Sequence, residues 1–198
     1  NLLGGEQSGF ITELGYETYQ KILKQAIKDL KTHEFRTFFS NELQDGENVT
    51  DECALDTDLD IGFGESYVPE SSERIGLYQE LDALTTEKEI EAYRQRMIDR
   101  FGPIPPQGEE LLRVVTLRQL GRQIGFEKII IKRGQMRCLF VSDQDDTYYD
   151  SKHFDGVLDY CGEHPKTCRL EEKNGKRSLF FHHCCTVKQA VEYLKCIK

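Results

Sequence analysis

The C-terminal end of the chain carries the densest set of potentially reactive side chains. It holds Cys161, His164, Cys168, His182, His183, Cys184 and Cys185. Thiolates and neutral imidazoles are the ligands of structural zinc sites, and a Cys beside a His and an acid is an arrangement of nucleophilic catalysis. The spacings favour neither chemistry. No Cys-x-x-Cys pair is present, and adjacent residues of a strand face opposite sides, so neither His182–His183 nor Cys184–Cys185 can chelate from one side.

We therefore expect no metal site and no catalytic residue at this end, and interpret it as buried thiols with exposed histidines. A small thiol or metal enzyme that uses these side chains is an alternative, which metal analysis and thiol titration of the pure protein would decide. Seven cysteines, an odd number at spacings that do not repeat, favour reduced thiols over a secreted disulfide framework.

Three other segments contain residues that bind phosphate or metal in other proteins. The pattern Gly-x-x-x-x-Gly-Lys-Ser/Thr is absent, and Gly4–Gly9 has glycines but neither a Lys nor a preceding strand. Asp51–Ala54 imitates the acidic box of a helicase without the hydrophobic strand that precedes such a box. Arg113, Arg118 and Arg122 are better explained as a solvated face paired with acidic residues than as a phosphate site. We expect no cofactor and no ATP hydrolysis by this chain.

Length and composition indicate a folded protein of one large or two small domains. The chain has 198 residues, of which 38% are hydrophobic and 10% aromatic, and a net charge of −9. That sign opposes strong DNA binding, because phosphate contacts require clustered Lys and Arg. No run of about 18 apolar residues predicts a membrane span. We expect a cytoplasmic protein.

The negative charge is concentrated in one segment. Residues 41–73 contain eleven Asp or Glu and no Lys or Arg. Because like charges repel and few apolar side chains are present, most of this segment is expected to be a solvated linker. Alternating apolar and polar residues from Leu55 to Phe63 predict one strand inside it.

Hydrophobic periodicity and turn residues predict an α+β fold: an N-terminal helix and a linker, then a compact domain of helices packed on small antiparallel hairpins. A capping box, Thr86–Glu89, and the hairpin turn Asn174-Gly175 are the sharpest local signals. Helices are expected over 16–33, 72–84, 86–101, 106–123 and 151–161 and after Thr186, and strands over 128–131, 136–141, 168–172 and 178–181.

Several motifs match one family. Asn1-Leu-Leu-Gly-Gly-Glu-Gln-Ser-Gly9 resembles the end of the translocation motif in bacterial transcription-repair coupling factors and their RecG-type helicase relatives. Ile98-Asp-Arg-Phe-Gly-Pro103, followed by Pro105 and Pro106, is similar to another stretch of the coupling factors. Glu73–Tyr78 resembles the entry to their C-terminal domain. The resemblance weakens beyond about Ile129.

The resemblance implies a parent protein that is a cytosolic, ATP-dependent DNA translocase, with ATP and Mg²⁺ bound by its motor domains. Such a parent binds duplex DNA, displaces stalled RNA polymerase and recruits the repair protein UvrA. It further implies three regions: the tail of the second motor domain over residues 1–40, an acidic linker over 41–56 and the C-terminal regulatory domain over 57–198.

Site residues follow from the resemblance as well. Gln7 matches a Gln of the translocation motif, whose partner Arg would precede Asn1. The family's C-terminal domain is an autoinhibitory clamp that packs on the UvrA-binding module, and its contact surface maps to Asp99 and Arg100. The family's type member has an acid one turn earlier, where this sequence has Arg96, so the charge pattern departs there.

An unrelated adaptor, whose acidic segment over residues 41–73 recruits basic partners, is an alternative to the regulatory clamp. Salt-sensitive binding by residues 41–73 alone would favour the adaptor.

Overall fold

A computed structural model describes residues 49–141 and 148–198. The described elements are, in chain order, β1 (Ala54–Thr57), α2 (Ser71–Asp82), α3 (Glu87–Phe101), α4 (Pro106–Ile124), β2 (Phe126–Lys132), β3 (Gln135–Phe140), α5 (Lys152–Glu163), β4 (Cys168–Lys173), β5 (Lys176–Phe181) and α6 (Val187–Lys195). The expected helix over 16–33 and Gln7 lie outside the described residues.

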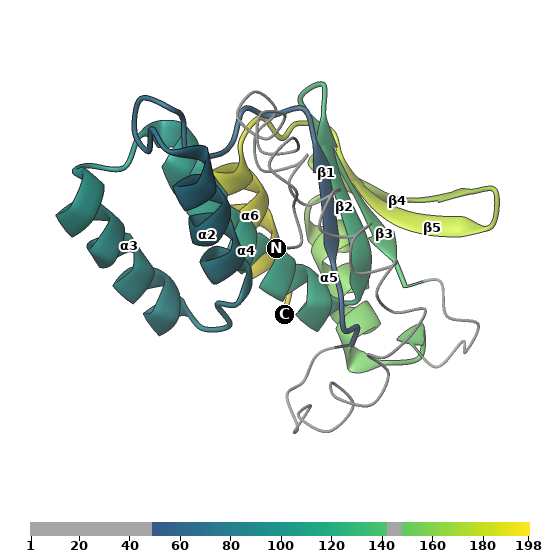
Figure 1. Cartoon of the computed structure of the whole chain (residues 1–198). Helices are drawn as coiled ribbons and strands as arrows, with labels where there is room; N and C mark the ends of the chain where they lie inside the picture. Colours follow the sequence, from purple (N-terminus) through teal and green to yellow (C-terminus); the bar gives the residue numbers. More distant parts are fainter. Residues whose placement is uncertain (1–48, 142–147) are drawn as a thin grey trace, which may run out of the picture.

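The strands form one mixed sheet of order β1-β2-β3-β5-β4. Both predicted hairpins are confirmed, and they join through antiparallel β3–β5 pairing, while β1 pairs in parallel with β2 at one edge. Helices α4, α5 and α6 lie beside the sheet, and α2 and α3 lie farther out, beyond α4 (Figure 1). This architecture confirms the predicted α+β class and adds a single five-stranded sheet to it.

Two hairpin turns explain how the sheet is built. Asn174 and Gly175 have φ values of 54° and 74°, and Arg133 and Gly134 have 54° and 73°. Two consecutive positive φ values are the geometry of a type I′ turn, whose twist matches that of paired strands. On the face of the sheet that the helices cover, the apolar side chain of Ile129 is 0% exposed.

Helix α4 is central, because it contacts β1, β2 and the other four described helices. Gly125 ends it in a left-handed conformation, which glycine adopts without the steric cost of a side chain. Gly108 and Gly121 allow the preceding segment to approach closely. A Cβ on Gly121 would lie 2.5 Å from the Cys53 sulfur, and one on Gly108 would lie 3.2 Å from the Phe63 ring.

The structure corrects the expectation for the acidic segment. Its described part is packed on the domain, since Cys53, Ile61, Phe63 and Val68 are buried. These apolar side chains find room at the α4 glycines, and the acidic residues between them remain largely exposed or half-exposed. Charge density therefore does not keep residues 53–68 solvated.

The strand expected from Leu55 to Phe63 is also corrected, because β1 ends at Thr57. The Thr57 hydroxyl accepts a hydrogen bond from the Leu59 amide at 3.1 Å, which turns the chain away from the sheet. The Gly62 amide then donates to the Gln107 carbonyl at 3.2 Å. Ile61 and Phe63 consequently join the helices.

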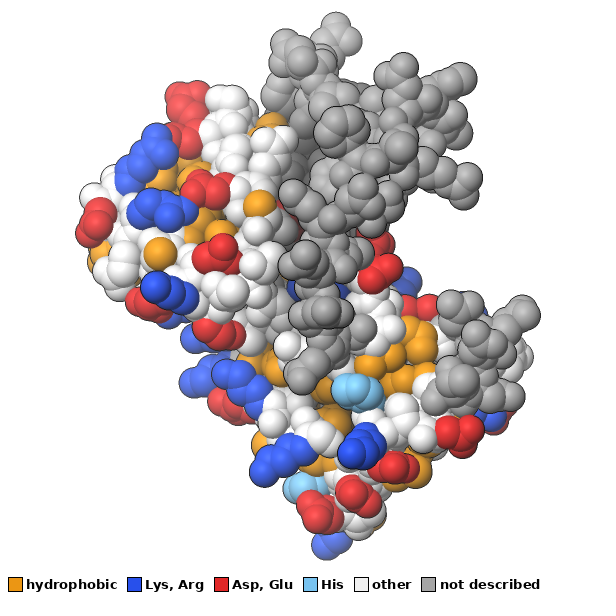
Figure 2. All heavy atoms as spheres, turned by 90° about the horizontal axis from the view of Figure 1, so that it is seen from below, with side chains coloured by type: hydrophobic (Ala, Val, Ile, Leu, Met, Phe, Trp, Pro, Cys, Tyr) orange, Lys and Arg blue, Asp and Glu red, His pale blue; other side chains and the backbone are white. Residues whose placement is uncertain are grey.

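The surface carries both signs of charge. Figure 2 shows Lys and Arg side chains interspersed with Asp and Glu on the face seen from below. Within the part of the chain that the structure describes, none of the helices combines the length and the apolarity that a bilayer span requires.

Candidate interdomain surface

Helix α3 carries the three predicted clamp residues, and its start is fixed by local hydrogen bonds. The Thr86 hydroxyl accepts from the Glu89 amide at 3.2 Å, and the Glu89 carboxylate accepts from the Thr86 amide at 2.8 Å. This is the predicted capping box. These hydrogen bonds lower the pKa of Glu89, because backbone donors from Thr85 and Thr86 stabilise its charged form.

Two tyrosines hold α3 in place, Tyr67 from the segment before α2 and Tyr93 of α3 itself. The Tyr67 hydroxyl donates to the Gly102 carbonyl at 2.8 Å, and the buried Tyr93 hydroxyl donates to the Leu77 carbonyl of α2 at 2.9 Å. Burial raises the pKa of Tyr93 well above its ordinary value, so this hydroxyl stays protonated and continues to donate. The end of α3 is therefore a rigid support for exposed side chains.

Arg96 and Arg100 reach across from α3 to α2. Arg96 forms an ion pair with Glu80, and Arg100 forms one with Glu73. The guanidinium of Arg100 also lies 4.9 Å from the centre of the Phe101 ring. Both arginines are more than half exposed, so each pair contributes at most about 1 kcal/mol to stability. A competing carboxylate can replace either glutamate at a low energetic cost.

Asp99 differs from the two arginines. It is exposed, and its carboxylate makes no hydrogen bond or ion pair with any residue that the structure describes. The structure thus brings Arg96, Asp99 and Arg100 together at one helix end, and leaves only the aspartate without a partner inside the domain.

Two of the three α4 arginines, Arg113 and Arg118, are paired with acidic residues as the sequence predicts, although they are less solvated than expected. Arg113 pairs with Glu110 at 2.9 Å, and Arg118 lies 3.7 Å from Asp82 while its Nε donates to the Cys53 carbonyl at 2.8 Å. Arg122 is partly buried, and burial together with the Arg118 charge lowers its pKa. Through the Cys53 carbonyl, Arg118 fastens the acidic segment to α4.

The cysteines and histidines do not converge on one point. Among residues 49–141 and 148–198, no three His, Cys, Asp or Glu side chains are placed to hold a metal ion. The sulfurs of Cys161 and Cys168 lie 3.8 Å apart. Burial raises the pKa of the Cys138 thiol well above its ordinary value, and raises the pKa of the Cys184 thiol to about 12. A raised pKa disfavours the nucleophilic thiolate, so neither buried cysteine is suited to catalysis.

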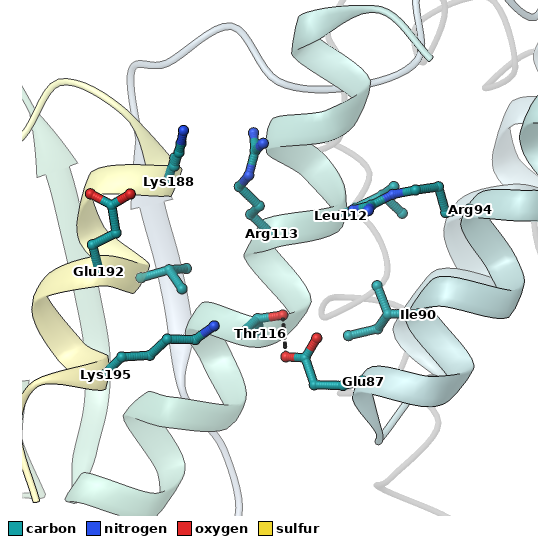
Figure 3. A pocket seen from close by; sticks show the side chains of 10 residues that line it. Glu87, Ile90, Arg94, Leu112, Arg113, Thr116, Lys188, Glu192 and Lys195 are labelled. Carbon is teal, nitrogen blue, oxygen red and sulfur yellow. Dashed lines mark hydrogen bonds between the residues drawn. The ribbon is translucent and has the colours of Figure 1, made fainter. Parts of the chain in front are cut away.

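One feature was missed by the sequence analysis. A groove of about 250 Å³ lies between α3, α4 and α6 (Figure 3). Its lining residues are Glu87, Ile90, Arg94, Leu112, Arg113, Thr116, Lys188, Val191, Glu192 and Lys195. Lys188 and Lys195 are seven positions apart on one side of α6, and this spacing is the sequence pattern that could have indicated the groove. Their neighbours on α3 and α4 are too distant in sequence to be recognised as part of one site.

A carboxylate from α4 positions the groove wall formed by α6. Glu110 accepts hydrogen bonds from the amides of Val187 and Lys188 in the first turn of α6. Negative charge is favourable at a helix N-terminus, where backbone donors have no partner within the helix. The Thr186 hydroxyl caps the same helix by accepting from the Gln189 amide at 3.0 Å, as predicted.

Comparisons with known proteins agree on one family. Residues 57–151 match the TRCF domain family. Over 132 residues, 65% of the chain, the sequence is 33% identical to a transcription-repair-coupling factor of Rickettsia prowazekii, of which it covers 11%. A coupling factor of Buchnera aphidicola subsp. Acyrthosiphon pisum is 30% identical over 170 residues, covering 86% of the chain and 19% of that relative. The chain therefore spans less than a fifth of the length of these relatives.

A solved structure shows the same fold. The crystal structure of the C-terminal domain of a transcription-repair coupling factor superposes with a TM-score of 0.58 and 16% sequence identity. The match covers 74% of this chain and 89% of the other chain.

Proposed function

Because the chain belongs to the transcription-repair coupling factor family, we propose that its described domain is the regulatory clamp of a DNA translocase. In this proposal the complete protein is cytoplasmic, binds ATP and Mg²⁺ in motor domains, moves on duplex DNA and displaces stalled RNA polymerase. The described domain packs on the UvrA-binding module and masks it until the motor engages. Gln7 contributes to the translocation motif of the motor. The domain itself performs no catalysis.

The end of α3 is the proposed contact surface, and the unpaired Asp99 is the observation that carries the assignment. Its exposed carboxylate stands on a helix end that Tyr67 and Tyr93 hold in place. Charged groups fixed on a rigid element set orientation and specificity across an interface more than they add affinity. Asp99 therefore selects a partner surface with a Lys or Arg opposite it.

Arg96 and Arg100 take part by exchanging partners. When the domain docks, carboxylates of the UvrA-binding module replace Glu80 and Glu73 as acceptors. The exchange is nearly neutral in energy because both existing ion pairs are exposed. A contact built in this way is specific yet easily opened, which suits a clamp that a motor must release.

Charge reversal in the complete protein tests the clamp. Asp99→Lys combined with Arg100→Glu is expected to release the UvrA-binding module and to raise UvrA affinity about tenfold or more, measured by titration calorimetry. Asp99→Lys alone separates docking from folding, because Asp99 has no partner within the described domain.

Asp159→Lys is the matched control, since Asp159 is an exposed aspartate on α5. It is expected to leave UvrA affinity unchanged. Equal UvrA affinity of the wild-type protein and of both Asp99 variants, with folding intact, would contradict the clamp.

A further inference from the structure

The groove between α3, α4 and α6 has an apolar floor. Ile90, Leu112 and Val191, one from each helix, line it and are 4%, 0% and 7% exposed. A volume of about 250 Å³ accommodates one or two aliphatic side chains. The floor is formed by helices that the domain core already fixes, so the groove exists before any ligand binds.

The groove rim carries four basic side chains. Arg94, Arg113, Lys188 and Lys195 surround the floor, against two carboxylates, those of Glu87 and Glu192. The Thr116 hydroxyl donates to Glu87 at 3.0 Å, so this carboxylate is turned toward α4 (Figure 3). Glu109 and Glu110 pair with the two arginines, so the positive charge of the rim that has no partner among the described residues is that of Lys188 and Lys195.

The two lysines of the rim are available for a ligand. Lys188 and Lys195 are exposed and form no ion pair with any residue in the described ranges. By contrast, Arg94 lies 3.1 Å from Glu109 and Arg113 lies 2.9 Å from Glu110. The Nε of Arg94 is nevertheless buried without a hydrogen-bond partner, and such a donor is usually satisfied by a partner or by water.

The combination of floor and rim selects one class of ligand. Duplex DNA offers regularly spaced phosphates and no aliphatic group for Ile90 and Val191. An amphipathic helix offers both, with aliphatic side chains at intervals of three or four residues and carboxylates beside them. Grooves walled by helices commonly accept such a helix through its apolar face.

We propose that this groove, which we call the α3–α4–α6 groove, binds an acidic amphipathic helix of a partner protein. A Leu or Ile of that helix packs in the groove against Ile90 and Val191, and its Glu or Asp side chains pair with Lys188 and Lys195. The groove lies on the side of α3 away from Arg96 and Asp99, because residues 90 and 99 are about half a turn apart around the helix. The inference therefore does not rest on the clamp.

Fluorescence anisotropy with the 198-residue chain tests the proposal. The probe is a labelled peptide of about 15 residues, long enough for four helical turns, with Leu on one face and Glu on both flanks. Lys188→Glu combined with Lys195→Glu is expected to weaken binding at least about tenfold, and the effect should shrink as salt is added. A peptide with every Glu replaced by Gln should bind more weakly to the unchanged chain.

Lys152→Glu combined with Lys166→Glu is the matched control, because both lysines are exposed and lie outside the groove. It should bind the peptide like the unchanged chain. Amide shifts in two-dimensional NMR should move at Ile90, Thr116 and Val191 when peptide is added. Shifts confined to other residues would overturn the proposal, as would the absence of binding at about millimolar peptide.

A duplex oligonucleotide serves as the competing probe. If the Lys188 and Lys195 variants lose DNA binding while peptide binding is unchanged, the groove is a nucleic-acid site and the peptide assignment is wrong.

Discussion

The two sides of helix α3 use charge in different ways. On the side toward α2, Arg96 and Arg100 are paired with Glu80 and Glu73 of the same domain. On the side toward α4 and α6, the lysines Lys188 and Lys195 stand over an apolar floor without partners among the described residues. The first side pairs both arginines within the domain, and the second leaves both lysines unpaired among the described residues. Similar residue types thus make an internal contact on one side and an open binding surface on the other.

This difference shows that a count of charges says little about function until the pairing is known. The α2 side would release its arginines only to a competing carboxylate. Binding at the groove displaces no ion pair of Lys188 or Lys195. Its apolar floor adds a contribution to the binding free energy that salt does not screen. Four sets of variants test this contrast.

Removing the support shared by both sides should have the largest effect. Met97 is 2% exposed on α3, and Met97→Ala is expected to lower the free energy of unfolding by about 2–5 kcal/mol, since a cavity remains where the side chain packed. Urea denaturation followed by circular dichroism measures it. Gln95→Ala, an exposed change on the same helix, should stay within about 0.5 kcal/mol. A similar loss for both variants would mean that α3 is not seated as described.

Loosening only the groove side should have a smaller effect. Glu110→Ala removes the acceptor for the amides of Val187 and Lys188. We expect a loss of about 1–2 kcal/mol in unfolding free energy, together with weaker binding of the acidic peptide. Glu109→Ala removes only an ion pair with Arg94, and its loss should not exceed about 1 kcal/mol. Unchanged peptide binding by Glu110→Ala would show that α6 needs no anchor from α4.

The start of α3 affects both sides alike, and it gives a pH-dependent test. Thr86→Ala should lower stability by about 1 kcal/mol, because a backbone donor loses its acceptor. The folded pKa of Glu89 is lowered by its hydrogen bonds, so its stabilising contribution is present above the unfolded pKa and is lost as pH falls through the folded pKa. Melting temperatures of Glu89→Gln and the unchanged chain should therefore differ near pH 7 and converge at acidic pH. A constant difference across this range would contradict the capping role.

Breaking the α2 side should have the smallest effect on stability. A double-mutant cycle of Arg96→Gln and Glu80→Gln is expected to give a coupling energy below about 1 kcal/mol that decreases with added salt. Urea denaturation of the four proteins measures it. A coupling above about 2 kcal/mol would identify the pair as structural and would remove the argument for easy partner exchange.

Much of the domain follows from local signals in the sequence. The capping box at Thr86 and Glu89 and the turn at Asn174-Gly175 each specify backbone geometry within a few residues, and both occur as predicted. The position of Arg96, Asp99 and Arg100 at one helix end likewise follows from helical spacing. Whether those residues form a clamp stays a prediction.

What could not be predicted depends on contacts between distant segments. The acidic segment packs because Cys53 and Phe63 fit against Gly121 and Gly108. No sequence pattern near residue 53 predicts these contacts with distant glycines. The pairing of Arg100 with Glu73 and the meeting of α3 with α6 in one groove are tertiary as well. Hydrophobic alternation also predicted a strand longer than β1, because a single hydrogen bond to the Thr57 hydroxyl turns the chain away from the sheet.

The edge position of β1 has a mechanical consequence. β1 runs parallel to β2, so a pull along its axis from the preceding chain is shared by all hydrogen bonds of the pair at once, whereas a sideways pull would break them one by one. Two attachments to α4 lie on the chain before β1 and would bear such a load first. The amides of Val49 and Thr50 donate to the Arg122 carbonyl, and the Cys53 carbonyl accepts from Arg118. Tension along this axis is thus passed to α4, which distributes it to the sheet and the remaining helices.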